Sequence, residues 1–119
     1  MIKVYQIQLT DAEVDAINRG EENEKFTAFM GRSFERTFKS EFIQYYSHVA
    51  NVDTNDMEAA FSLMNLWNDE SLVERLGPCS SMSVGDILEM KDGSKYRCAS
   101  FGFTKITAWH LARMCYIKM

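Results

Sequence analysis

The sequence predicts an α+β fold, a single compact domain in which two or three helices cover a mixed or antiparallel sheet. Three observations support this expectation. The chain of 119 residues has the size of one ordinary domain. Its most regular amphipathic segment, residues 55–68, repeats its apolar residues with the period of a helix. Residues 81–104, in contrast, contain two strand-like runs joined by a tight turn. Hydrophobic residues make up 46% of the chain and charged residues 25%, which is typical of globular proteins. We therefore expect residues 1–119 to form one domain.

The N-terminal region predicts a strand followed by a short helix. Residues 2–9 are rich in strand-forming side chains and end at a polar boundary. Thr10 and Glu13 have the spacing of a capping box, in which each side chain accepts a hydrogen bond from a backbone N–H of the first helical turn. A helix should then run from residue 11 to about residue 19. Its inward-facing apolar residues are expected to be Val14 and Ile17.

Two interpretations remain open for residues 25–40. Five apolar side chains recur as in an amphipathic helix that is interrupted at Gly31, and a strand over residues 25–30 followed by a loop is the alternative. Under either interpretation we expect these side chains to be core residues: Phe26, Phe29, Met30, Phe34 and Phe38. Residues 42–51 then predict a strand, and Val52 continues its apolar pattern.

The most regular helix is expected over residues 55–68. Thr54 precedes it as the expected N-cap, and acidic residues follow in the first turn, where they complement the helix dipole. One stripe of side chains should pack on the sheet or on another helix: Met57, Ala60, Phe61, Met64 and Trp67 or Asn68. Gly77 and Pro78 mark a turn in the connection that follows.

A β-hairpin is predicted within residues 81–104. Asp92 and Gly93 supply the positive φ values that a right-twisted hairpin turn requires. Gly85 marks a bulge or a close approach of two backbones, and Asp86 is expected to hold the local turn by accepting from a neighbouring amide. Residues 107–119 predict either a short closing helix or an edge strand.

Composition and spacing disfavour several classes of function. The net charge of −4 argues against broad contact with phosphate backbones. The three cysteines are odd in number and form no CxxC pair, which indicates reduced thiols and neither a disulfide framework nor a zinc site. No apolar run approaches the length of a membrane span, and the N-terminus lacks the features of a secretory signal. An enzyme is the least favoured class, because no pattern predicts catalytic residues, a cofactor or a metal. We expect a cytoplasmic protein.

Three segments of the C-terminal half carry a resemblance to a known family. They read Val-Asp-Thr-Asn-Asp-Met-Glu-Ala-Ala-Phe-Ser-Leu-Met-Asn at 52–65, Ser-Met-Ser-Val-Gly-Asp-Ile at 81–87 and Tyr-Arg-Cys-Ala-Ser-Phe-Gly-Phe at 96–103. In this order they resemble small uncharacterised proteins of tailed bacteriophages and, more distantly, the YodL-like domains of bacterial mobile elements. The resemblance implies a phage origin, a compact α+β fold and a place in the cytoplasm of the infected bacterium. It implies no catalytic residues.

Two binding functions are compatible with these observations. The first is a phage accessory protein that binds and modulates a host protein, with exposed aromatic side chains as the contact residues: Phe101, Phe103, Trp109 and Tyr116. The alternative is a small nucleic-acid-binding domain, because a Val-Gly-Asp strand followed by a tight turn also occurs in PUA-like and ASCH-like barrels. Aromatic residues would then stack on bases, and the phosphates would be contacted by Arg32, Arg36 and Lys95.

Overall fold

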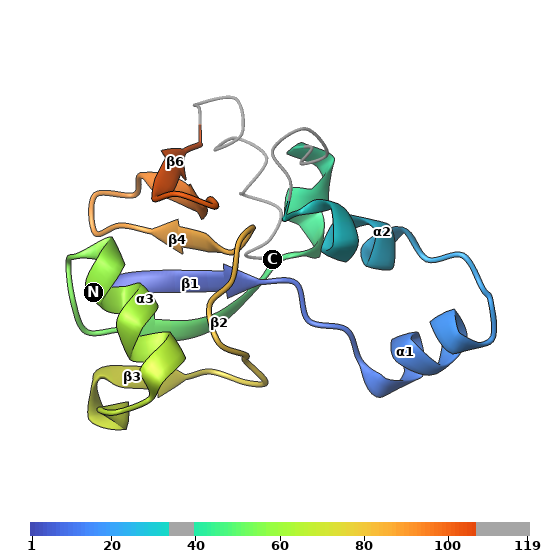
Figure 1. The fold of residues 1–119 in the computed structure, drawn as a ribbon, viewed down its shortest axis with the longest axis horizontal. Coiled ribbons are helices and arrows are strands. Elements are labelled where there is room, and N and C mark those ends of the chain that lie inside the picture. Colours follow the sequence, from blue (N-terminus) through green and yellow to red (C-terminus); the bar gives the residue numbers. More distant parts are fainter. Residues whose placement is uncertain (34–39, 107–119) are drawn as a thin grey trace.

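The sheet has six strands, is antiparallel throughout and follows the order β3-β2-β1-β4-β5-β6 (Figure 1). The computed structural model describes residues 1–33 and 40–106. The strands are β1 (Ile2–Gln6), β2 (Ser47–Val52), β3 (Val73–Arg75), β4 (Ile87–Glu89), β5 (Lys95–Cys98) and β6 (Phe103–Lys105). The helices in these ranges are α1 (Asp11–Asn18), α2 (Glu24–Gly31) and α3 (Met57–Leu66), with the 3₁₀ turns η1 (Ser40–Tyr45) and η2 (Glu70–Leu72). The predicted α+β single domain is confirmed.

Both faces of the sheet are covered, and each face has its own cluster of buried residues. Adjacent residues of a strand point to opposite faces, and Leu88 belongs to one cluster while Ile87 belongs to the other. On the first face α3 packs through Ala60 and Met64 (Figure 1). On the second face α2 and η1 contribute the buried side chains of Ala28 and Ile43. The central strand β1 supplies residues to both clusters, so it is buried from both sides.

The first helix confirms the predicted capping box but not the predicted burial. The Thr10 hydroxyl accepts from the Glu13 amide at 3.1 Å, and the Glu13 carboxylate accepts from the Thr10 amide at 2.8 Å. The expectation that Val14 and Ile17 face inward was wrong, because α1 contains no buried residue. This helix lies beyond the end of the sheet (Figure 1), where it is tied to Lys25 by an ion pair with Glu13.

The region for which two interpretations were open begins with the helix α2, which spans residues 24–31. The helical interpretation was therefore correct for this part, and α2 ends at Gly31. The expected core was only partly correct. Ala28 is the buried residue of this helix, Phe26 and Phe29 are half-buried, and Met30 is exposed. A small side chain at Ala28 allows the helix to approach the sheet closely. Phe34 and Phe38 lie outside the described residues.

The predicted strand over residues 42–51 was wrong in its first half. Residues 40–45 form the 3₁₀ segment η1, and β2 begins only at Ser47. Ile43 and Tyr46 are both buried, and the Tyr46 amide donates to the Ile43 carbonyl at 3.1 Å. Residues three apart share one side of a 3₁₀ turn. This turn therefore buries the same apolar residues that made the segment look like a strand.

The third helix is close to its predicted position but has a different cap. Its N-cap is Asp56, whose side chain accepts from the Glu58 amide, and the expected cap at Thr54 was wrong. The Thr54 hydroxyl instead accepts from the Asp56 amide at 3.1 Å. The helix ends at Trp67, which has a left-handed φ of 52°. Beyond it lies β3, a short edge strand that the sequence did not predict.

The predicted hairpin is confirmed, but its second arm is shorter than expected and ends at Cys98, and of Asp92 and Gly93 only Gly93 has the expected positive φ. Strands β4 and β5 pair around the turn at Gly93, which has a φ of +89°. A second turn at residues 99–102 returns the chain as β6, paired with β5. Residues 107–119, for which we expected a closing helix or an edge strand, lie outside the described residues.

Candidate functional site

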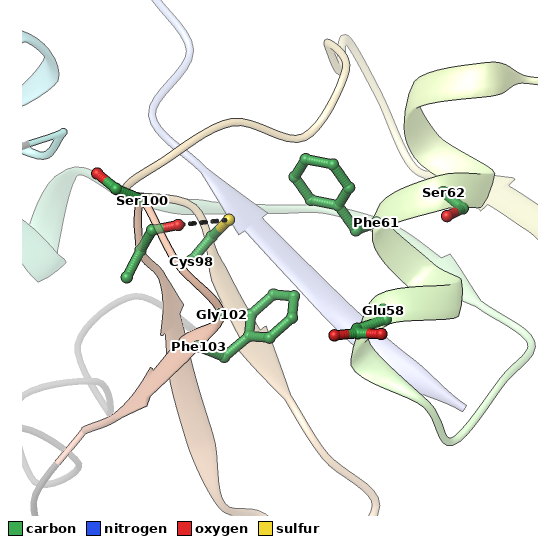
Figure 2. Close-up of a pocket in the computed structure, with 8 residues that line it drawn as sticks. Glu58, Phe61, Ser62, Cys98, Ser100, Gly102 and Phe103 are labelled. Atoms are coloured by element: carbon green, nitrogen blue, oxygen red, sulfur yellow. Dashed lines mark hydrogen bonds between the residues drawn. The ribbon is translucent and has the colours of Figure 1, made fainter.

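An open pocket lies between α3 and the turn that joins β5 to β6 (Figure 2). Its volume is about 350 Å³. One wall comes from the exposed face of α3 and consists of Glu58, Phe61 and Ser62. The other wall comes from the end of β5, the turn and the start of β6, and consists of Cys98, Ala99, Ser100, Gly102 and Phe103. The site therefore brings together residues 58–62 and residues 98–103, which lie far apart in the sequence.

The turn on one side of this pocket places an aromatic side chain in solvent. The Ala99 amide donates to the Gly102 carbonyl at 3.0 Å, and Gly102 has a positive φ of 75°, which favours glycine. Between them Phe101 is 95% exposed. Phe61, across the pocket, is 38% exposed, and Phe103 is partly buried. Phe61 and Phe103 thus line the pocket, Phe103 also packs against the first buried cluster, and Phe101 lies in the adjoining turn with its side chain in solvent.

The thiol that lines the pocket is not activated for chemistry. Burial raises the pKa of Cys98 to about 11, and the charge of Asp86 acts in the same direction. A thiol with so high a pKa stays protonated at neutral pH, and the thiolate is the nucleophilic form. Cys98 is therefore not suited to act as a nucleophile.

A buried polar cluster lies behind the turn before β4. Asp86 is 2% exposed, and its Oδ2 accepts from Gln6 Nε2 at 2.9 Å and from the Ser83 amide at 3.0 Å. Arg32 Nε lies 3.9 Å from the other carboxylate oxygen. Burial raises the pKa of Asp86 to about 6, although these hydrogen bonds and the arginine oppose the increase. The expectation that Asp86 holds the local turn is confirmed by its bond to Ser83.

A second buried cluster surrounds Glu89 on β4. The Tyr5 hydroxyl donates to the Glu89 carboxylate at 2.7 Å, and Lys95 Nζ lies 3.6 Å from the same oxygen. Burial and this carboxylate raise the pKa of Tyr5 above its ordinary value. Lys95 is only 8% exposed, and the Arg32 side chain is 13% exposed. Two of the three cations expected to contact phosphates are therefore engaged inside the protein, while Arg36 lies outside the described residues.

The predicted aromatic contacts are only partly placed. Phe101 is exposed and Phe103 lines the pocket, whereas Trp109 and Tyr116 lie outside the described residues. Sequence reasoning missed the pocket because it placed Phe61 in the core stripe of α3 and explained the acidic residues of the first turn by the helix dipole. In the structure Ala60 and Met64 are the buried residues of α3, whereas Phe61 is exposed, and the spacing of these residues gave no signal of that difference.

A smaller cavity of about 200 Å³ lies between α2 and η1. Two of its polar groups already pair with each other, because the Tyr45 hydroxyl donates to the Glu24 carboxylate at 2.9 Å. This carboxylate and burial raise the pKa of Tyr45. The cavity therefore offers a ligand less space and fewer free polar groups than the pocket beside α3.

Other kinds of site are not seen in the described part of the chain. Residues 1–33 and 40–106 contain no group of three or more histidine, cysteine, aspartate or glutamate side chains that could hold a metal ion. His48 Nε2 lies 2.7 Å from the side-chain oxygen of Asn51. None of the helices in these ranges has the length and hydropathy needed to cross a bilayer.

Comparisons with known proteins give no information about the candidate site. The chain matches no protein-family model, and no curated protein or solved structure is significantly similar to it.

Proposed function

We propose that this protein acts by binding another protein through the aromatic surface formed by Phe61, Phe101 and Phe103. In keeping with the resemblance of residues 52–65, 81–87 and 96–103 to phage proteins, the proposed partner is a host protein in the cytoplasm of the infected bacterium. Binding would modulate that protein during infection. The observation that carries this proposal is Phe101, which is 95% exposed beside an open pocket.

The energetics of interfaces favour this surface as a contact. Large aromatic side chains dominate binding energy when a partner buries them, and hot spots lie beside pockets from which water is excluded. Phe101 projects from a turn and contributes almost nothing to the buried core. A partner that covers it therefore gains apolar contact without disturbing the fold.

The alternative, nucleic-acid binding, receives less support. It requires cations that reach phosphates, whereas Arg32 lies beside Asp86 and Lys95 beside Glu89. The net charge of −4 opposes it as well. The aromatic surface is therefore better suited to a protein than to a polyanion.

Affinity capture tests the proposal directly. The immobilised full chain is incubated with bacterial lysate at several salt concentrations, and any retained protein is purified and titrated against the wild type and Phe101→Ser. We expect Phe101→Ser to weaken binding by at least about tenfold, the effect of losing a hot-spot aromatic residue. Its stability should be unchanged, because the side chain is in solvent.

Leu76→Ser is the matched control. Leu76 is also an exposed apolar residue, but it follows β3, at the opposite edge of the sheet from β6. It should leave binding unchanged. Failure to retain any protein, or equal binding by Phe101→Ser and the wild type, would contradict the proposal. A salt-dependent shift of labelled single-stranded RNA or DNA would favour the nucleic-acid alternative instead.

A further inference from the structure

We infer that the pocket between α3 and the β5–β6 turn receives an arginine side chain of the partner protein. This inference rests on the proposed function and assigns the chemistry of one contact within it. Three features of the pocket support it. Its walls are aromatic, its carboxylate has no partner among the described residues, and the lining that these residues form contains no lysine or arginine.

The walls of the pocket are suited to a flat cationic group. Figure 2 shows Phe61 reaching from α3 and Phe103 reaching from β6 into the space between the two elements, with the Glu58 carboxylate directed toward the same space. Aromatic rings attract a cation that lies over their faces, because the ring face is the negative end of its quadrupole. A carboxylate beside the rings adds a direct partner for the N–H groups of that cation.

The charges around the pocket point to the same ligand. Among the described residues that line it, Glu58 is the one charged side chain, and none is a lysine or an arginine. Within residues 1–33 and 40–106 the Glu58 carboxylate makes no hydrogen bond and no ion pair. The whole chain has a net charge of −4. The pocket therefore complements a positive group, and a negative ligand would meet an uncompensated carboxylate.

The protein contains an internal example of the proposed contact. At the C-terminal end of α3 the Arg75 guanidinium lies 4.3 Å from the centre of the Trp67 ring, and its Nη2 lies 2.8 Å from the Glu70 carboxylate. An aromatic face and a carboxylate thus hold an arginine at this protein's own surface. The described lining of the pocket likewise combines aromatic rings with a carboxylate, but it contains no arginine.

Arginine suits this pocket better than lysine. Its guanidinium is planar, stacks on aromatic faces and is more weakly hydrated than an ammonium group, while its several N–H groups allow it to bond a carboxylate at the same time.

A titration followed by NMR tests the inference without knowledge of the partner. The full chain is titrated with N-acetyl-arginine amide, with N-acetyl-citrulline amide as an uncharged analogue of the same shape, and with N-acetyl-lysine amide. We expect the arginine compound to shift the amide signals of Glu58, Phe61 and Phe103. Citrulline should bind about tenfold more weakly, from the loss of one cation–π contact and one exposed ion pair. Equal binding of citrulline, or shifts elsewhere, would overturn the inference. Equal binding of lysine would overturn the choice of arginine.

Two charge-removing variants localise the effect. Glu58→Gln keeps the shape of the side chain and should weaken binding of the arginine compound about fivefold, because one exposed ion pair is lost. Glu22→Gln removes the same charge from an exposed residue between α1 and α2 and should change nothing. Equal affinities for the two variants would overturn the role of Glu58. Phe61→Leu, at a half-exposed position, provides a second test that leaves the core intact.

The capture assay separates this inference from the proposed function. A partner that is lost with Phe101→Ser but is insensitive to Glu58→Gln and to excess arginine compound would overturn the inference and leave the proposed function standing. If the arginine compound binds at the pocket and no protein is captured, the proposed function fails and the arginine contact with a partner fails with it, while the cation pocket remains. Loss of the partner with Glu58→Gln but not with Glu22→Gln would support both.

Discussion

Gly85 marks the place where the turn before β4 touches the end of α2. Its φ is +96°, and a Cβ atom built there would lie 2.5 Å from both Cγ and the carbonyl oxygen of Arg32. The Tyr46 hydroxyl donates to the Gly85 carbonyl, and Arg97 Nη1 donates to the Arg32 carbonyl at 3.3 Å. The close backbone approach predicted from the sequence is therefore confirmed, and it joins α2 to the sheet.

Gly85→Ala should destabilise the protein strongly. The left-handed backbone and the collision with Arg32 together should lower the free energy of unfolding by about 3 kcal/mol. Gly93→Ala is the matched control, because Gly93 has a similar φ of +89° and open space where the Cβ would lie. It should cost about 1 kcal/mol, from the backbone alone. Urea denaturation of both variants measures the difference. Equal losses would show that the contact with Arg32 is easily relieved.

Asp86 should make stability depend on pH near 6. Its pKa is about 6 in the folded protein and 3.8 in the reference state, so the folded protein holds this proton more tightly than the unfolded chain. Stability is therefore gained as the pH falls through 6 and is lost as the pH rises again. From pH 7.5 to pH 5 the carboxyl should add about 1.4 kcal/mol to the free energy of unfolding.

Asp86→Asn isolates this effect, since an amide does not titrate. Between pH 7.5 and pH 5 the part of the free energy of unfolding that comes from Asp86 should increase in the wild type and be absent in the variant, as measured by denaturation at both pH values. Other titrating groups cancel in the difference between the two proteins. The gain depends on burial of Asp86 outweighing the groups that face it, which are Arg32 and the hydrogen bonds from Gln6 and Ser83. A more stable wild type at pH 7.5 would mean that these partners dominate.

At the level of the helices, a complete N-terminal cap does not mean that the helix contributes to the stability of the whole protein. The capping box of α1 is complete, yet the helix buries no residue. The cap of α3 is a single aspartate, yet α3 buries Ala60 and Met64 against the sheet. A cap strengthens the whole protein only when the helix it starts is part of the cooperative core.

Cap removal should therefore affect the two helices differently. Asp56→Ala should lower the global free energy of unfolding by about 1 kcal/mol. Thr10→Ala should leave that global value nearly unchanged and should instead increase hydrogen exchange within α1, whose opening does not require unfolding of the sheet. Exchange measured by NMR alongside denaturation separates the two effects. A global loss with Thr10→Ala as large as that with Asp56→Ala would show that α1 folds as part of the core.

The same elements show how far the sequence could predict this structure. Local signals succeeded, since the capping box at Thr10 and the turn at Gly93 depend only on neighbouring residues. The sequence did not predict features that depend on contacts with residues distant in the chain. Residues 42–45 have strand-forming side chains, but Ile43 meets the core from a 3₁₀ turn. The edge strand β3 is only three residues long and is defined by its pairing with β2. The pocket was missed for the same reason, because its walls are about 40 residues apart in the chain.

Considered as a whole, the molecule depends on its central strand. β1 pairs with β2 on one side and with β4 on the other, so Val4 lies opposite both Ala50 and Leu88. The two buried clusters share this strand, with Val4 in the first and Tyr5 in the second. Neither cluster can lose its packing without exposing residues of β1. The two faces should therefore unfold together.

Truncation of one core residue in each cluster tests this cooperativity. Met64→Ala opens a cavity under α3, and Ile43→Ala opens one under η1; both residues are fully buried. Each should lower the free energy of unfolding by about 3 kcal/mol. Denaturation followed separately by circular dichroism and by tryptophan fluorescence, to which Trp67 beside the first cluster contributes, should give one transition, with coincident midpoints and an unchanged slope. Two transitions in either variant would mean that the faces unfold independently. A single transition would show that β1 transmits the loss of either cluster to the whole sheet, including the strands that position the aromatic surface.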